Sequence, residues 1–350
     1  MVARLCWNPN AEESRSIARD ETSTQKTHFK LPREDITRAL RLEKYNYFVN
    51  IGSVKKFFDY LGSESNSDID AVDPRLENMP FIEAFGHHYH ISGKIFLPFD
   101  EPERKRLEVQ HKLYRHCLDG ALTNTRLPLD TAHIVDLGTG IGVWAIEMAA
   151  RYPQTQITGI DVYPIQRRKG VPPNVKFVIA DVEDPWDFPD NSIDFVHARS
   201  IAGGVQDWPA LLRQAYTKLK PGGLFEMTEI ALNVLDFDGK FAEADLCPEF
   251  LKIFRDLCDK VGMDFNPSPH VPDWLVEADF EKIVQRSEIL PAGSWAQDEK
   301  LKARQALMNS ITTEHYGTFL VEVPDATPCP YRYTTTAAPR DNETRTDISN

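Results

Sequence analysis

The stretch His133-Ile-Val-Asp136-Leu-Gly138-Thr-Gly140-Ile-Gly142-Val-Trp-Ala-Ile-Glu147 decides the fold of this chain. It begins with a short apolar run, continues with three alternating glycines, and ends with apolar residues at helical spacing. Because glycine has no Cβ, backbone N–H groups and the start of a helix can approach a ligand closely at such a loop. The stretch therefore predicts a strand, a ligand-binding loop and a helix, in that order.

Strand and helix patterns alternate on the C-terminal side of this stretch. Strands separated by helices predict a mostly parallel sheet with helices on both faces, which is a Rossmann-like α/β fold. A further helix is expected from about Glu101 to about Leu118, because an acid and Pro102 mark its first turn. The predicted strands are His133–Leu137, Gln156–Asp161, Val175–Ala180, Ile193–His197 and Leu224–Ile230, and the predicted helices are Val143–Arg151 and Trp208–Leu219.

The spacing of the glycines indicates which ligand the loop binds. A dinucleotide-binding loop has the pattern G-x-G-x-x-G, and its third glycine would fall at Val143. Asp136 stands two residues before Gly138, where a carboxylate repels a pyrophosphate but attracts the ammonium and sulfonium charges of S-adenosylmethionine. We therefore predict a site for S-adenosylmethionine and disfavour the alternative, an NAD-dependent oxidoreductase.

Two further acids follow the next predicted strands. Asp161 lies where a carboxylate can accept hydrogen bonds from both ribose hydroxyls, and Asp181 lies where one can accept from an adenine amino group. Strand ends of a parallel sheet meet at one edge, so the three acids are expected around one crevice. The predicted donor-binding residues are Asp136, Gly138, Thr139, Gly140, Gly142, Asp161, Val162, Asp181, Val182 and Arg199.

At these residues the chain resembles the class I methyltransferases. Further motifs are Tyr89-His90, Leu97–Glu101, Arg106-Leu107, His111, Val135–Ile146, Gly159–Gln166, Val171–Asn174, Arg199 and Leu219–Gly223. Through these motifs the chain from about 80 to 300 resembles the LaeA-like methyltransferases of filamentous fungi. The resemblance implies a seven-stranded sheet, S-adenosylmethionine as methyl donor and a place in fungal secondary metabolism. Members either tailor a product or regulate production with velvet-type partner proteins. We favour methylation of a small-molecule natural product, because the acidic, aromatic-lined 231–300 segment looks adequate to enclose an acceptor, and the regulator is the alternative. The usual final strand is not recognisable after residue 320, where Gly317–Val323 is the candidate.

The remaining sequence suggests how the chain is divided. Residues 1–80 are expected to be a partly disordered extension with helical spacing at Asp35–Tyr60, and 321–350 a disordered tail. The methyltransferase domain is predicted to span 81–320. Within it, 81–130 would form a lid and helix, 131–230 the donor-binding core and 231–300 a helical cap over the acceptor.

Methyl transfer mainly requires that the nucleophile, the methyl carbon and the sulfur are aligned in a dry pocket, so a catalytic base is optional. Glu226 and Glu229 would face opposite sides of a regular strand. His197 also fits a histidine of the protein core, and Trp208 and Trp295 also fit packing residues. The weak catalytic candidates are His90, His197 and Glu229, and the candidate acceptor-binding residues are Tyr89, Ser200, Trp208 and Trp295.

Composition excludes several other classes of function. The chain has 350 residues and carries 53 acids against 40 bases, a net charge of −13 that disfavours nucleic acid as a partner. Its longest apolar runs are far shorter than the ~18–20 residues that span a bilayer. The five cysteines include no C-x-x-C pair, so we expect reduced thiols, no metal site and residence in the cytoplasm or nucleus.

Overall fold

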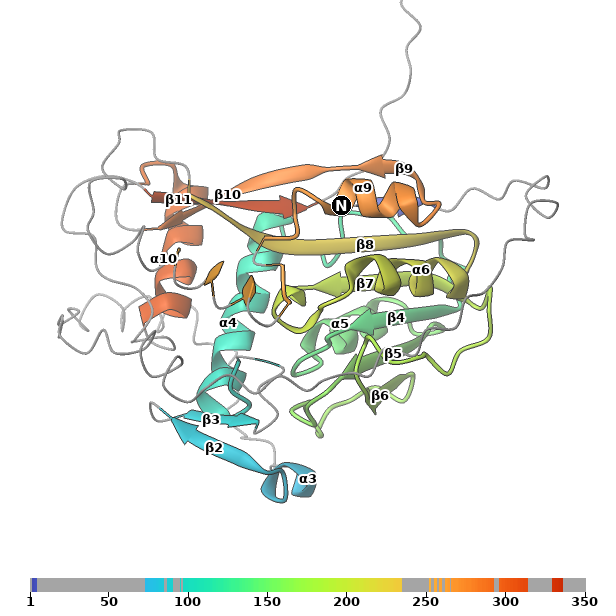
Figure 1. Ribbon diagram of the computed structural model, residues 1–350, viewed down its shortest axis with the longest axis horizontal. Helices are drawn as coiled ribbons and strands as arrows, with labels where there is room; N and C mark the ends of the chain where they lie inside the picture. The colour runs from blue at the N-terminus through green and yellow to red at the C-terminus, as the bar shows by residue number, and fades with distance from the viewer. Residues whose placement is uncertain are drawn as a thin grey trace, which may run out of the picture.

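The computed structural model shows a large mixed sheet with helices packed on it and a separate small hairpin (Figure 1). The structure describes residues 2–4, 73–84, 87–90, 97–234, 262–264, 266–292, 296–313 and 329–335, and in addition residues 95, 252, 255, 256, 258 and 259. Within these residues no helix is long and apolar enough to cross a membrane, and no group of three metal-binding side chains occurs.

Five strands form the parallel centre of the sheet, as the sequence predicts. Their spatial order is β8-β7-β4-β5-β6, and each neighbouring pair is parallel. Since the carboxyl ends of all five strands lie at one edge, the loops that follow them converge there. The strands are β4 (His133–Leu137), β5 (Gln156–Asp161), β6 (Val175–Ile179), β7 (Ile193–Arg199) and β8 (Leu219–Val234).

Helices cover both faces of this centre because successive strand residues point to opposite sides. Ile134 of β4 belongs to the cluster of α5 (Val143–Arg151), whereas Val135 belongs to the cluster of α6 (Trp208–Lys218). The two helices thus bury their apolar sides against opposite faces of the same strand. Both helices match the sequence prediction within a residue.

The helix α4 (Glu101–Cys117) begins where the sequence predicts. Asp100 caps it by accepting a hydrogen bond from the Glu103 amide at 3.1 Å, and Pro102 stands in the first turn. Asp100 also accepts from the His88 amide at 2.9 Å and lies 2.9 Å from His87 Nδ1. These contacts tie the hairpin to the start of α4. The hairpin consists of β2 (Phe81–Ala84) and β3 (His87–His90), and the short helix α3 (Pro74–Glu77) precedes it.

The region expected to be a helical cap contains strands. Residues 281–292 form β9 (Glu281–Val284) and β10 (Arg286–Ala292), so the prediction of a helical 231–300 is wrong there. Leu290 of β10 is fully buried and packs in a cluster with residues of α4 and α10. This tertiary packing stabilises an extended conformation that the local sequence periodicity does not indicate. The helices of this part are α9 (Val271–Glu277) and α10 (Glu299–Thr313).

The C-terminal segment contributes a strand to the sheet. Cys329–Thr335 forms β11, which lies between β8 and β10 and runs antiparallel to both (Figure 1). The prediction of a tail without structure from 321 is therefore wrong for these seven residues. Two tyrosines and two threonines in this segment suit a strand, but the pairing partners lie far away in sequence. At the N-terminus, β1 (Val2–Arg4) pairs with β8 and β9. Gly317–Val323 and Asp35–Tyr60 lie outside the described residues.

Candidate donor-binding site

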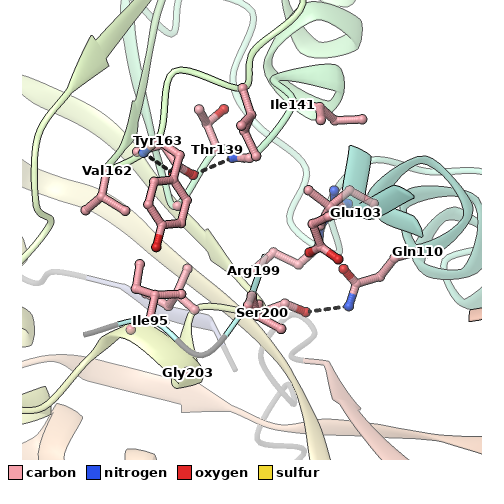
Figure 2. A pocket seen from close by; sticks show the side chains of 18 of the residues that line it. Ile95, Glu103, Gln110, Thr139, Ile141, Val162, Tyr163, Arg199, Ser200 and Gly203 are labelled. Carbon is pink, nitrogen blue, oxygen red and sulfur yellow. Dashed lines mark hydrogen bonds between the residues drawn. The ribbon is translucent and has the colours of Figure 1, made fainter. Parts of the chain in front are cut away.

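A cavity of about 290 Å³ opens at the carboxyl edge of the parallel strands. It lies between the glycine loop after β4, the ends of β5, β6 and β7, and one side of α4 (Figure 2). Its volume is at the lower end of the range typical of small-molecule sites. The residues that line it include Ile95, Leu97, Pro98, Glu103, Arg106, Leu107, Gln110, Asp136, Gly138, Thr139, Gly140, Ile141, Val143, Asp161, Val162, Tyr163, Ile165, Asp181, Val182, Arg199, Ser200, Ile201, Gly203 and Gly204.

The three glycines of the loop have different surroundings. All three have positive φ, with 62° at Gly138, 56° at Gly140 and 77° at Gly142. A Cβ on Gly138 would lie 2.4 Å from Ile201, and one on Gly142 would lie 2.4 Å from the ring of Phe177. At Gly140 the nearest atom would be 3.5 Å away and the residue lines the cavity. Gly140 therefore leaves room for a ligand, whereas Gly142 allows close packing and does not line the cavity.

Asp136 is part of the cavity wall, and its carboxylate is already hydrogen-bonded. It accepts from Thr139 Oγ1 at 2.6 Å and lies 2.7 Å from His197 Nδ1. Because an ionised carboxylate only accepts, Nδ1 carries the proton of that hydrogen bond. The His197 ring is buried and stacks on Trp144 at a centroid distance of 3.7 Å. His197 is thus a core histidine that orients Asp136, and it does not line the cavity, which removes its case as a catalytic residue.

Asp161 links the glycine loop to the end of β5. One carboxylate oxygen accepts from the Gly140 amide at 2.7 Å and the other accepts from the Tyr163 amide at 3.0 Å. Burial, with a smaller contribution from Asp136, raises the pKa of Asp161 to about 6. Each oxygen keeps a lone pair, so the group can still accept hydrogen bonds from a ligand.

Gln166 supports the loop from a position that the sequence reasoning did not single out as a site. Its Nε2 donates to the carbonyl oxygens of Gly140 at 3.0 Å and Tyr163 at 2.7 Å, and the residue is buried. The signal that could have found it is a glutamine within the Gly159–Gln166 motif. A buried amide that bonds two turns holds both in place.

Asp181 lies in the loop after β6 and also lines the cavity. Its Oδ1 accepts from the Glu183 amide at 2.9 Å, which shapes the turn. Val162 and Val182, the neighbours of the second and third acids, line the cavity as well. The three strand-end acids therefore surround one cavity.

The opposite wall comes from α4 and contains a buried ion pair. Arg106 donates from Nε to Glu103 at 2.6 Å and from Nη2 at 2.7 Å, and the two side chains are 5% and 3% exposed. Burial raises the pKa of Glu103 although Arg106 works against that rise. The pair was missed from the sequence, where only its spacing of three residues on a helix could have indicated it.

Arg199 ends β7 and Ser200 follows it, and both line the cavity where β7 meets α4 (Figure 2). The Arg199 guanidinium lies 3.1 Å from His111 Nδ1 and over the ring of Tyr114, 4.8 Å from its centroid. Ser200 has a φ of 55°, which is uncommon for a residue with a Cβ. Its hydroxyl accepts from Gln110 Nε2 at 3.3 Å and is hydrogen-bonded to the Tyr114 hydroxyl.

Other acceptor and catalytic candidates lie elsewhere. Trp208 is 1% exposed and stacks on Trp274 in the core, so its expected role in acceptor binding is wrong. Tyr89 and His90 are half-buried on β3 and do not line the described cavity. Burial, together with Asp100 and Glu103, raises the pKa of Tyr89 to about 12. Trp295 lies outside the described residues.

Glu226 and Glu229 face opposite sides of β8, as expected from their spacing. Glu226 accepts from the amides of Asn124 and Thr125, each at 3.0 Å. Glu229 accepts from the amides of Ile201 at 2.6 Å and Ala202 at 3.1 Å, both through Oε1. Neither carboxylate lines the described cavity, so Glu229 shapes the wall instead of contacting a ligand there.

Comparison with known proteins decides the family. A family model described as a methyltransferase domain matches residues 109–288. The methyltransferase pytC of Aspergillus terreus is 34% identical over 246 residues, which cover 70% of this chain and 75% of that protein. The chain belongs to the S-adenosylmethionine-dependent methyltransferases.

Other relatives of this methyltransferase carry different names. The secondary metabolism regulator LAE1 of Cochliobolus heterostrophus is 32% identical over 229 residues, covering 62% of this chain and 73% of that protein. The protein-methionine methyltransferase laeA of Emericella nidulans is 34% identical over 233 residues, covering 64% and 60%. Among solved structures, a methyltransferase of Thermotoga maritima has a TM-score of 0.39 and 18% identity, covering 67% of this chain and 94% of that chain.

The cavity of the methyltransferase fits its donor, S-adenosylmethionine. The open side of Gly140 faces the cavity, where a Cβ would take up space. Asp136, Asp161 and Asp181 place three carboxylates on the same wall, which suits a ligand that carries positive charge and hydroxyl donors. Arg106 of α4 and Arg199 of β7 line the opposite side and supply N–H donors for the carboxylate of the donor.

Proposed function

We propose that this methyltransferase transfers a methyl group to a small-molecule natural product as a tailoring step of fungal secondary metabolism. The observation that carries the proposal is one cavity that has three strand-end acids on one wall and polar groups of α4 and β7 on the other. The similarity to pytC, which is named a methyltransferase, supports an enzymatic role.

The donor would lie along the strand ends. Asp161 would accept from the ribose hydroxyls and Asp181 from the adenine amino group, while Val162 and Val182 would contact the adenosine part. Gly138, Thr139 and Gly140 would border the methionine part, with the Asp136 charge behind them. Gly142 would act through packing, because it does not line the cavity. Arg199 would bind the donor's carboxylate.

When bound, S-adenosylmethionine supplies an electrophilic methyl carbon beside a good leaving group. The residues of this chain would align the acceptor with that carbon and exclude water. Ser200 stands at the end of the cavity formed by β7 and α4, where its hydroxyl could orient an acceptor. His90 and Glu229 do not line the described cavity. Neither residue would therefore act as a catalytic base in this proposal.

The acceptor would be enclosed from the N-terminal side. Ile95, Leu97 and Pro98 line the cavity and would form the inner face of the expected lid, 81–130 with its helix. No described residue of 231–300 lines the cavity. The acceptor-cap role of that segment therefore depends on the residues between 235 and 261 that the structure leaves undescribed.

A regulatory role is the second candidate, because several relatives are named secondary metabolism regulators. In that case the chain would bind the donor and act through velvet-type partner proteins. The donor site is expected in both cases, so donor binding does not separate them.

Two experiments test these proposals. Calorimetry should show binding of S-adenosylhomocysteine and none of NAD; binding of NAD alone would contradict the donor assignment. Metabolites of strains with and without the gene should differ by one product, replaced by a species lighter by one methyl group. Broad loss of many products, with capture of velvet-type proteins and no labelled methyl product, would favour regulation instead.

A further inference from the structure

We propose that His111 is a positioning residue that holds the Arg199 guanidinium toward the donor and does so only while its imidazole is neutral. The proposal rests on the proposed role of Arg199 in donor binding. It concerns a chain of three side chains from three elements: Glu147 on α5, His111 on α4 and Arg199 on β7.

The hydrogen bond between Arg199 and His111 fixes the tautomer of the imidazole. Arg199 Nη2 lies 3.1 Å from His111 Nδ1, and a guanidinium can only donate. Nδ1 must therefore offer a lone pair, so the proton of the neutral ring is on Nε2. That nitrogen lies 3.2 Å from Glu147 Oε1, although the contact is poorly aligned for a hydrogen bond. A carboxylate thus faces the N–H and a guanidinium faces the lone pair.

Burial and two nearby arginines favour the neutral ring near neutral pH. His111 is 4% exposed, and burial together with the Arg199 charge lowers its pKa. Glu147 works in the opposite direction, while Arg115 on the same helix lowers the pKa further and binds Glu147 Oε2 at 3.1 Å. The Tyr114 phenol also lies against this cluster, and burial together with the Glu229 charge raises its pKa far above its usual value, while Arg199 and Arg106 act in the opposite direction.

Protonation of His111 would reverse the interaction with Arg199. The second proton would go to Nδ1, so two donors and two positive charges would meet at a distance that now holds a hydrogen bond. Arg199 would then have to move away from its place in the cavity wall. Affinity for a ligand carboxylate should fall as the solution becomes acidic.

The test measures the affinity for S-adenosylhomocysteine by calorimetry between about pH 5 and about pH 8. His111→Asn is the matched variant, because its side-chain oxygen can take the place of Nδ1 and accept from Arg199 but does not titrate. His111→Ala removes the acceptor. Asp161, with a pKa of about 6, titrates in every variant, so the difference between variants isolates His111.

Wild type should lose about tenfold more affinity than His111→Asn between neutral and acidic pH. His111→Ala should bind about tenfold more weakly than wild type at neutral pH, with a folded-state circular dichroism spectrum. Equal pH profiles for wild type and His111→Asn, or unchanged affinity in His111→Ala, would overturn the proposal. A nitrogen NMR spectrum showing the proton of His111 on Nδ1 would also overturn it. Failure of wild type to bind S-adenosylhomocysteine at any pH would instead refute the proposed function.

Discussion

The two halves of the sheet are built from signals of different range. On the donor side, β4 pairs with β5, and the paired residues Val135 and Thr158 are only about 20 positions apart. On the other side, Tyr333 of β11 pairs with Ile230 of β8, about 100 positions earlier. Local spacing can specify the first kind of pairing, whereas the second depends on contacts that form only when distant segments meet. The strand pairing of the donor half can therefore be predicted from the sequence, whereas the pairing of the other half cannot.

The largest effect is expected from a change in the donor half. Gly140→Val should weaken the affinity for S-adenosylhomocysteine at least a thousandfold, or about 4 kcal/mol. Its φ of 56° strains any branched residue, and the new side chain would enter the cavity. Calorimetry measures the loss.

Gly170→Val is the matched control for that variant. Gly170 has a φ of 67° and nothing within 4 Å of a Cβ, and it does not line the cavity. It introduces similar backbone strain without filling the site. If both variants bound the ligand equally well, the site would be misplaced.

The bounds of the donor half show how far local patterns reach. β4, α5 and β5 have the residues that the sequence predicts, because glycine spacing and apolar periodicity mark their ends. The acids at the strand ends could be placed in the same way. The Glu103–Arg106 pair and Gln166 could not, since their partners are set by how α4 and the loop after β5 pack on the sheet.

A second prediction tests the non-local half. Tyr333→Pro should lower the free energy of unfolding by about 3 kcal/mol, because Tyr333 pairs with Ile230 on one side and Glu288 on the other. Tyr333→Thr keeps the backbone donor and a strand-forming side chain, so it should cost far less. Urea unfolding gives both values. Equal stabilities of the two variants would mean that 329–335 does not pair as a central strand.

Glu229 sits where the two halves meet, and its removal should have an intermediate effect. Glu229→Ala leaves the Ile201 and Ala202 amides without their acceptor, which should cost about 2 kcal/mol. Glu229→Gln keeps that oxygen and should change stability by less than about 1 kcal/mol at about pH 4, where the carboxyl group is mostly protonated in the folded and the unfolded state.

The stability difference between wild type and Glu229→Gln should also depend on pH. Burial raises the pKa of Glu229 to about 8, so the folded state binds a proton that the unfolded state releases more easily. The wild-type stability contributed by this proton is complete at acidic pH and is lost as pH rises through about 8. Urea unfolding at about pH 6 and about pH 9 should show wild type losing stability relative to Glu229→Gln. The same difference in free energy of unfolding between wild type and Glu229→Gln at both pH values would contradict the raised pKa of Glu229.

The smallest predicted effect concerns Ser200, at the end of β7. With a φ of 55°, the serine backbone is less favourable than glycine, but its hydroxyl bonds Gln110 and Tyr114. Ser200→Ala loses the hydrogen bonds and keeps the strain, whereas Ser200→Gly loses the bonds and relieves it. The glycine variant should therefore be more stable than the alanine variant by about 1 kcal/mol in urea unfolding. Equal stabilities would show that the serine is unstrained, and the strand end would then owe its shape to Glu229 and the Thr228 carbonyl, which bonds the Ser200 amide at 2.9 Å.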